Sequence, residues 1–134
     1  MGLRVLPSLG VVAALLSAAP LSYGHHSFAV HYDSKKVITL AGVAKKFRFT
    51  NPHGILELEV KGDKGEMQSW TVETTAPVFM SRRGWSKDTI KPGDNLVIEG
   101  WPARDGTRLM RIKKVTLPDG KELVQSGPSA ATGE

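Results

Sequence analysis

The sequence VITLAGVAKKFRFTNPHGILELEV, residues 37–60, decides the fold. In residues 55–60 apolar side chains alternate with glutamates, which is the period-two pattern of a strand with one buried face. Residues 37–49 predict a longer strand, in which Gly42 marks a bend or a bulge. The apolar face of this strand is expected to hold Val43, Phe47 and Phe49. The segment 51–54, which contains a proline, predicts the turn between the two strands.

Four further strands are expected downstream, separated by turn residues. They are residues 68–74, with Trp70 and Val72 facing inward, then 95–101, 107–117 and 122–124.

A short helix is predicted between the third and fourth strands. Thr75 can cap it, Pro77 suits the first turn, and Gly84 suits a left-handed exit. Val78 and Phe79 are expected on its apolar face.

This order of elements indicates a mainly β protein. It matches a small five- to six-stranded oligonucleotide/oligosaccharide-binding (OB) barrel, which has one short helix between strands three and four. A split sheet or a small open sandwich would give nearly the same pattern. The fold alone would not identify a ligand, because this barrel carries many unrelated sites.

The start of the chain reads as a secretory signal peptide over residues 1–24. Arg4 is its only charged side chain, residues 11–19 are almost entirely apolar, and small Ser22 and Gly24 precede the expected cut. We therefore expect a periplasmic or secreted protein. A cut after Ala19 or Tyr23 and an uncleaved anchor are the alternatives.

The remaining chain is long enough for one domain, expected over residues 25–125, and the small polar tail 126–134 is expected to be disordered. The net charge of +5 is a weak indication of anionic partners. Because the sequence contains no cysteine, a metal site would need nitrogen and oxygen ligands.

A distinctive set of residues is spread along most of the chain. It consists of His25, His26, Ser27, Phe28, Tyr32, Asp33, Gly42, Val43, Asn51, Pro52, His53, Trp70, Glu73, Gly84, Trp85, Pro92, Gly93, Asp94, Gly100 and Pro102. Together these residues resemble the domain-of-unknown-function family 6152, a group of small secreted bacterial proteins. The resemblance implies secretion and a single domain, and it implies no activity.

The pair His25 and His26 is the clearest indication of chemistry. A cut after Gly24 would free an amine beside the imidazole of His25, and a third nitrogen would complete a histidine brace suited to Cu(II). A cut after Tyr23 would instead make Gly24, His25 and His26 the first three residues. A histidine in the third position forms the amino-terminal chelate for Cu(II) or Ni(II). The alternatives are a flexible polar terminus, and a proton-sensing or partner-contact role.

Three residues could complete such a site. His53 lies in a loop at one end of the barrel, where loops carry ligand contacts, although its ring could instead cap the turn. Glu73 could orient a histidine, or form an ion pair with Arg82 or Arg83. His31 could contact a ligand or face solvent.

We therefore expect an exported binding protein and no enzyme, since the sequence lacks a phosphate loop, a nucleophile elbow and a metalloprotease motif. Its predicted metal ligands are His25, His26 and His53, with copper as the candidate ion and with His31 and Glu73 as supporting contacts. A metal-independent module for an envelope protein or an anionic glycan is the alternative. Nucleic acid is excluded among the expected partners, and so is a stable membrane span after removal of the signal.

Overall fold

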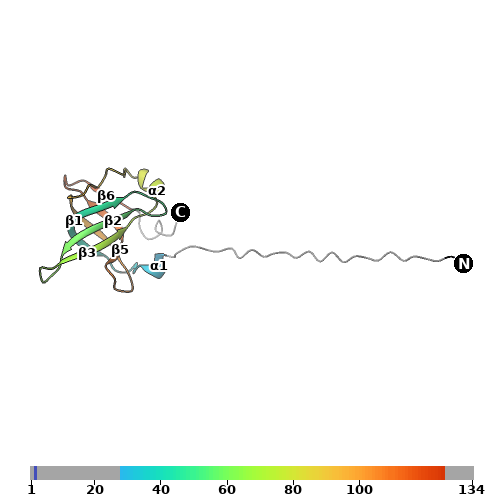
Figure 1. The fold of residues 1–134 in the computed structure, drawn as a ribbon, viewed down its shortest axis with the longest axis horizontal. Coiled ribbons are helices and arrows are strands. Elements are labelled where there is room, and N and C mark those ends of the chain that lie inside the picture. Colours follow the sequence, from blue (N-terminus) through green and yellow to red (C-terminus); the bar gives the residue numbers. More distant parts are fainter. Residues whose placement is uncertain (1, 3–27, 126–134) are drawn as a thin grey trace.

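The computed structural model describes residue 2 and residues 28–125 of the chain (Figure 1). Its helices and strands are α1 (Phe28–His31), β1 (Ile38–Arg48), β2 (Ile55–Lys61), β3 (Met67–Glu73), α2 (Pro77–Ser81), β4 (Asn95–Pro102), β5 (Leu109–Thr116) and β6 (Glu122–Val124). Three predicted features lie outside the described residues. They are the signal peptide, of which only residue 2 is described, the pair His25 and His26, and the tail 126–134.

The six strands form one sheet in the order β3-β2-β1-β4-β5-β6, and β3 also pairs with β5. This last pairing is parallel and covers residues 71–73 and 109–111. It closes the first five strands into a barrel, with β6 added at the edge of β5. The predicted mainly β, OB-like barrel with a helix between the third and fourth strands is therefore confirmed.

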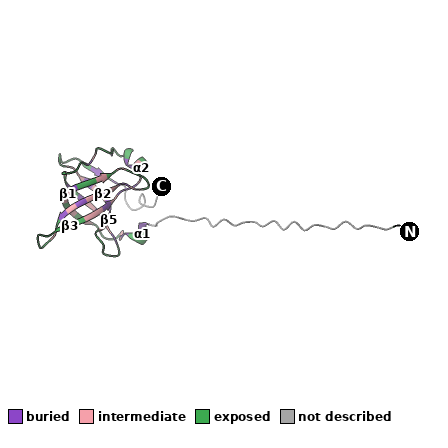
Figure 2. Cartoon of the chain, viewed as in Figure 1, coloured by how far each residue is buried: buried purple, intermediate pink, exposed green. Residues whose placement is uncertain are grey.

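Every strand of the closed sheet contributes buried side chains to the core. Figure 2 colours the buried segments of the chain purple. The even-numbered apolar residues of β2 face inward, as their alternation with glutamates predicted. The largest fully buried side chains include Leu56, Leu58, Val72, Leu96, Ile98, Met110 and Ile112.

The long first strand changes its inward face at a bulge. Its pairing with β2 shifts register between Ala44 and Lys46, so Ala44 is buried and Val43 is not. A bulge adds one residue to one strand and so moves the following side chains to the opposite face. The prediction that Val43 shares a face with Phe47 is therefore wrong.

The second helix differs from its prediction in two respects. Pro77 does occupy its first turn, but the cap residue is Ala76, with no side-chain hydrogen bond. Thr75 is engaged elsewhere, because its hydroxyl accepts a bond of 3.1 Å from the amide of Gln125. In a helix of five residues one side chain reaches the core, and this is Met80 rather than Val78.

A short helix precedes the barrel and was not predicted. In α1, Phe28 is buried, and so is Tyr32 just after the helix, whereas Val30 is 66% exposed. Phe28 lies edge-on to Trp101 of β4, with 5.3 Å between ring centroids. Within the described part of the chain, no helix is long and apolar enough to cross a membrane.

We predict that Gly100→Ala destabilises the barrel. A Cβ atom at this position would contact the backbone oxygen of Arg111 and the end of the Met110 side chain. Overpacking of this kind lowers the free energy of unfolding by about 1–3 kcal/mol. Urea denaturation measures the effect, with exposed Ser69→Ala expected to stay within about 0.5 kcal/mol of wild type. Equal stability of the two variants would contradict the prediction.

Candidate functional site

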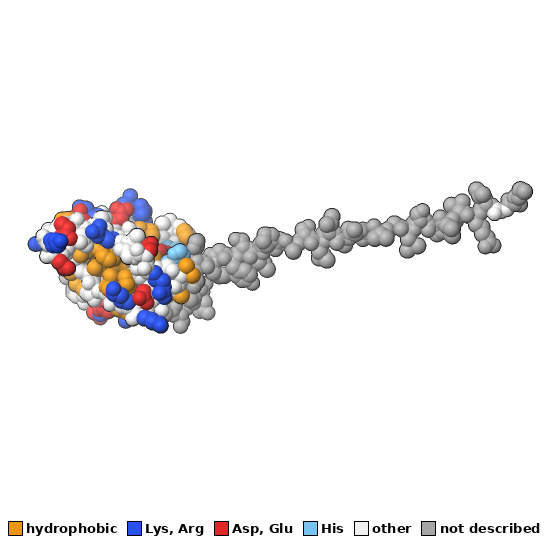
Figure 3. All heavy atoms as spheres, turned by 90° about the horizontal axis from the view of Figure 1, so that it is seen from below, with side chains coloured by type: hydrophobic (Ala, Val, Ile, Leu, Met, Phe, Trp, Pro, Cys, Tyr) orange, Lys and Arg blue, Asp and Glu red, His pale blue; other side chains and the backbone are white. Residues whose placement is uncertain are grey.

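A pocket of about 260 Å³ lies where α1, the loop between β1 and β2, the end of β3 and the start of β5 meet. Its lining combines an apolar wall with four groups that can ionise and a phenol. The residues are Phe28, His31, Tyr32, His53, Glu73, Leu109 and Arg111. In Figure 3 the visible histidine surface borders apolar side chains.

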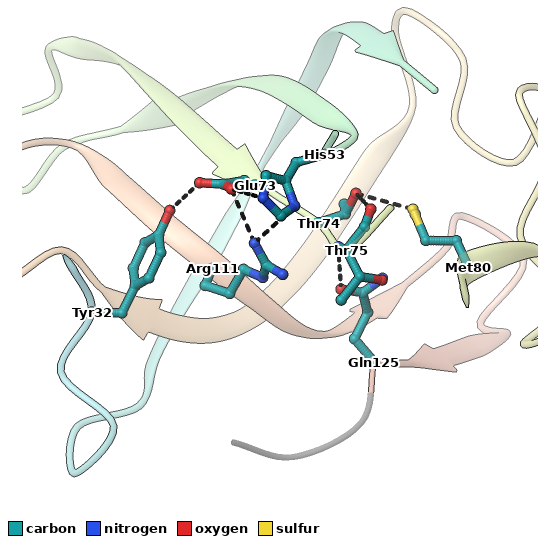
Figure 4. A network of polar contacts seen from close by, with 8 residues as sticks. All are labelled: Tyr32, His53, Glu73, Thr74, Thr75, Met80, Arg111 and Gln125. Atoms are coloured by element: carbon teal, nitrogen blue, oxygen red, sulfur yellow. Dashed lines mark hydrogen bonds and ion pairs between the residues drawn. The ribbon is translucent and has the colours of Figure 1, made fainter. Parts of the chain in front are cut away.

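Glu73 accepts contacts from three different parts of the chain (Figure 4). The Tyr32 hydroxyl donates a hydrogen bond to Oε2. Nη1 of Arg111 lies 3.0 Å from Oε1, and Nε2 of His53 lies 3.5 Å from the same oxygen. This carboxylate therefore joins the residue that follows α1, strand β5 and the loop between β1 and β2 at one point.

The ion pair with Arg111 is buried and spans the seam of the barrel. Glu73 and Arg111 are direct partners in the parallel pairing of β3 with β5, and their side chains are 20% and 6% exposed. Burial lowers the pKa of Arg111, although the charge of Glu73 acts in the opposite direction. A buried guanidinium is stable only when it is paired and hydrogen-bonded, so Arg111 depends on Glu73.

The backbone next to His53 places its ring beside Glu73. Gly54 accepts a hydrogen bond of 2.8 Å from the amide of Thr74 and donates one of 3.3 Å to the carbonyl of Thr75. A Cβ atom on Gly54 would collide with the Thr74 hydroxyl, so glycine permits this close approach. His53 and Glu73, which directly precede Gly54 and Thr74 in the sequence, are thereby held near each other.

Both ring nitrogens of His53 take part in these contacts. Its Nδ1 lies 3.4 Å from Nη1 of Arg111. A guanidinium only donates, so in the neutral tautomer that fits this contact Nδ1 is the acceptor and Nε2 carries the hydrogen that faces Glu73. A metal ion bound to His53 would consequently replace either Arg111 or Glu73, and the ring, whose side chain is 40% exposed, is reachable from solvent.

The structure brings together three of the predicted site residues, His31, His53 and Glu73, in one pocket. The predicted pairing of Glu73 with Arg82 or Arg83 is wrong, because those residues follow α2 whereas the strand pairing presents Arg111.

That Tyr32 and Arg111 belong to the site was not predicted from the sequence. One signal for Arg111 was available, since among the cations of this strand it alone stands directly between two apolar residues, Met110 and Ile112. Among the residues that the structure describes, no three histidine, aspartate or glutamate side chains form a group that could hold a metal ion.

We predict that Glu73→Gln destabilises the protein more than any loss of a surface ion pair. Removing one partner of a buried pair costs about 3–5 kcal/mol, because the other charge stays buried. The matched control is Glu59→Gln, which breaks the exposed pair with Lys45 and is expected to cost about 0–1 kcal/mol. Urea denaturation measures both, and similar losses would show that Arg111 does not depend on Glu73.

The phenol of Tyr32 predicts a decline in stability at high pH. Burial, followed by the hydrogen bond to Glu73, raises the pKa of Tyr32 far above its ordinary value of about 10. Above pH 10 the unfolded state has lost this proton and the folded state keeps it, so the free energy of unfolding falls as pH rises. Denaturation between pH 8 and 11 should show this decline in wild type and a smaller one in Tyr32→Phe. Identical slopes would refute the assignment.

Comparisons with known proteins place this site in context. The model of the family of unknown function DUF6152 matches residues 13–111. No curated protein matches the chain. Among solved structures, the barrel is similar to the crystal structure of Rim1, a mitochondrial single-stranded DNA binding protein from S. cerevisiae. The TM-score is 0.47 with 11% sequence identity, and the match covers 61% of this chain and 93% of Rim1.

The Rim1 match contradicts the expected partners. That prediction excluded nucleic acid, and a protein of similar fold is itself named for binding single-stranded DNA. The exclusion of nucleic acid is therefore withdrawn from the expected partners. At this low identity the likeness concerns the fold alone.

The family match covers most of the chain and includes every residue of the pocket. The resemblance predicted from the sequence is thus confirmed, and the chain belongs to the family of unknown function DUF6152.

Proposed function

We propose that this chain is an exported copper-binding protein. Its ligands for Cu(II) are the free amine and imidazole of His25, with His26 beside them, and an imidazole of the pocket, for which His53 is the residue predicted from sequence. The observation that carries the proposal is that Phe28, which closely follows His25 and His26, lines the same pocket as two further histidines.

Covalent geometry supports this arrangement without any assumption about the conformation of residues 25–27. Consecutive Cα atoms are about 3.8 Å apart, so the Cα of His25 lies within about 11 Å of that of Phe28. Phe28 itself is fixed, since its ring stacks on Tyr32 with 5.3 Å between centroids. Chain length therefore permits His25 and His26 to reach the pocket, and that placement is part of the proposal.

The chemistry of the donors favours copper. Imidazole and amine nitrogens suit Cu(II), which stands highest among the divalent metals of the first transition row in affinity. The chain contains no thiolate that would favour a softer ion. A carboxylate next to a ligand histidine is the usual second partner of such a ring, and Glu73 has this relation to His53.

Binding rather than catalysis is the proposed role, and export is part of the proposal. The brace requires a mature chain that begins at His25, which only removal of the signal would produce. A cut after Tyr23 would produce the other chelate, built on Gly24, His25 and His26. Mass spectrometry of the exported protein therefore distinguishes the two ligand sets.

The test is a Cu(II) titration of the mature protein with its native amino terminus. We expect a Kd below about 1 µM, and a loss of about 100-fold or more in the His25→Ala, His26→Ala double variant. A Gly-Ser-Gly-Ser extension ahead of His25 is the matched control, because it keeps both imidazoles and removes the amine from the site. Weaker binding by wild type, or equal binding by the double variant, would refute the proposal.

A further inference from the structure

Trp70 fills an opening of the barrel that the strand pairing creates. Strand β1 pairs with β2 from Gly42 onward, whereas its first residues, 38–41, pair with β4. On the other side, β3 pairs with β5 over residues 71–73. Trp70 precedes that pairing, shares a strand face with buried Val72, and packs against the core. Its indole therefore lies where the hairpin of β2 and β3 separates from both neighbouring strands.

Two clefts share this indole as a wall. One, of about 330 Å³, lies between Trp70 and the turn that joins β4 to β5, residues 103–108. The other, of about 300 Å³, lies between Trp70, the start of β1 and the turn that joins β2 to β3. Sites for small molecules have volumes of about 300–1,000 Å³, so each cleft suits one small ring.

The far wall of the first cleft is held in place before any ligand arrives. Arg104 lines this cleft, and its backbone amide donates a hydrogen bond of 2.9 Å to the carbonyl of His31. Its side-chain Nε donates another, of 2.8 Å, to the carbonyl of Ala29. The amide of Thr71 donates one of 2.9 Å to the carbonyl of Arg108. A wall that is already ordered loses less entropy on binding.

The N–H group of Trp70 lacks an acceptor. Its Nε1 atom is buried, and no atom in the described part of the chain accepts a hydrogen bond from it. An indole nitrogen only donates, and buried donors are normally paired. Packing alone therefore holds the ring, so a small rotation breaks no hydrogen bond. A ligand oxygen that meets the N–H group after such a rotation supplies the missing acceptor.

Trp85 shows that an unpaired indole needs a cleft beside it to become a site. Its Nε1 atom is likewise buried, with no acceptor among the described residues, but the residue is only 2% exposed. Trp70 is partly exposed and forms the wall of two clefts. Of these two residues, Trp70 is the one that can present a ring face to a ligand.

The rims of the two clefts carry the same combination of charges. Asp33 and Lys36 line the first cleft, and Asp63 and Lys61 line the second. A ligand with a fixed negative charge would be attracted by each lysine and repelled by each aspartate. A hydroxyl group donates to a carboxylate and accepts from an ammonium group, so it suits both. The rims therefore match a ligand rich in hydroxyl groups.

We propose that the two clefts beside Trp70 bind an uncharged sugar chain, with one sugar ring in each cleft. The C–H face of a sugar ring packs on the apolar indole, while its hydroxyl groups reach the charged rims. The site shares no residue with the proposed copper site, so either proposal can fail without the other.

The test is a titration of the exported protein with uncharged hexasaccharides, in EDTA so that no metal binds. The probes are the β-1,4-linked and α-1,4-linked glucose hexamers and the β-1,4-linked N-acetylglucosamine hexamer. Calorimetry should give a Kd below about 1 mM for at least one of them, and weaker binding of its monosaccharide. Tryptophan fluorescence locates the site, because Trp85 and Trp101 are each 2% exposed and a spectral change reports on Trp70.

Trp70→Phe is the decisive variant. It keeps an aromatic side chain for the core, but it removes the N–H group and reduces the ring face. We expect about a 10-fold loss of affinity, in line with the loss of one hydrogen bond and part of an aromatic contact, and no remaining change in fluorescence. Thermal unfolding shows whether the barrel of this variant remains folded.

Two pairs of lysines provide matched controls for the rims. Lys36→Ala and Lys61→Ala should each lose about 3-fold or more in affinity, because each removes a hydrogen bond to the sugar. Lys35→Ala and Lys64→Ala change neighbouring lysines that line neither cleft, and they should bind like wild type.

Three results would overturn the proposal. One is a Kd above about 1 mM for all three hexamers. Another is wild-type affinity in folded Trp70→Phe. The third is tighter binding of a polyuronate, an oligodeoxythymidylate or a proline-rich peptide than of every uncharged sugar, because the clefts would then recognise charge or a peptide rather than hydroxyl groups.

Discussion

The pocket depends on one interaction, the buried ion pair between Glu73 and Arg111 at 3.0 Å. It sits where the barrel closes, because β3 and β5 pair in parallel over only three residues each and these two are the last partners. The apolar partners beside them, Val72 and Met110, face the core. Since side chains alternate along a strand, the charged pair lies on the other side of the seam, where α1 covers it.

A pair of this kind fixes geometry more than it adds stability. Taking both charges out of water costs nearly as much as their attraction returns, so replacing the pair with apolar groups would be close to neutral. Its presence sets the register of the seam instead, because a slip of one residue would turn both side chains away from each other. Tyr32 and His53 then attach to a carboxylate whose position is already determined.

The sequence predicted the parts of this structure that depend on local pattern. The alternation in residues 55–60 identified β2 and its buried face, and the placement of Pro77 and Gly84 identified the helix and its exit, where Gly84 has φ of 85°. A bend or bulge was predicted in β1 at Gly42, but the register shift lies a few residues later, between Ala44 and Lys46, because the position of the extra residue depends on the pairing with β2. The partner of Glu73 escaped it as well, since pairing Glu73 with Arg111 requires knowing which strands close the barrel. The short α1 offered too few residues to show a helical period.

The hold of the barrel on α1 bears on how the proposed copper site could form from few residues. The seam and the turn at residues 103–108 hold α1 in place, so in the proposed mature chain only residues 25–27 would separate the amino terminus from a fixed position. Ordering the backbone costs about 1–2 kcal/mol per residue, which limits the entropic cost of assembling the ligands to roughly 3–6 kcal/mol. Without Arg104 and Tyr32 the whole of α1 would have to be ordered on binding, and that cost would at least double. The affinity of the proposed site would therefore depend on contacts that never touch the metal.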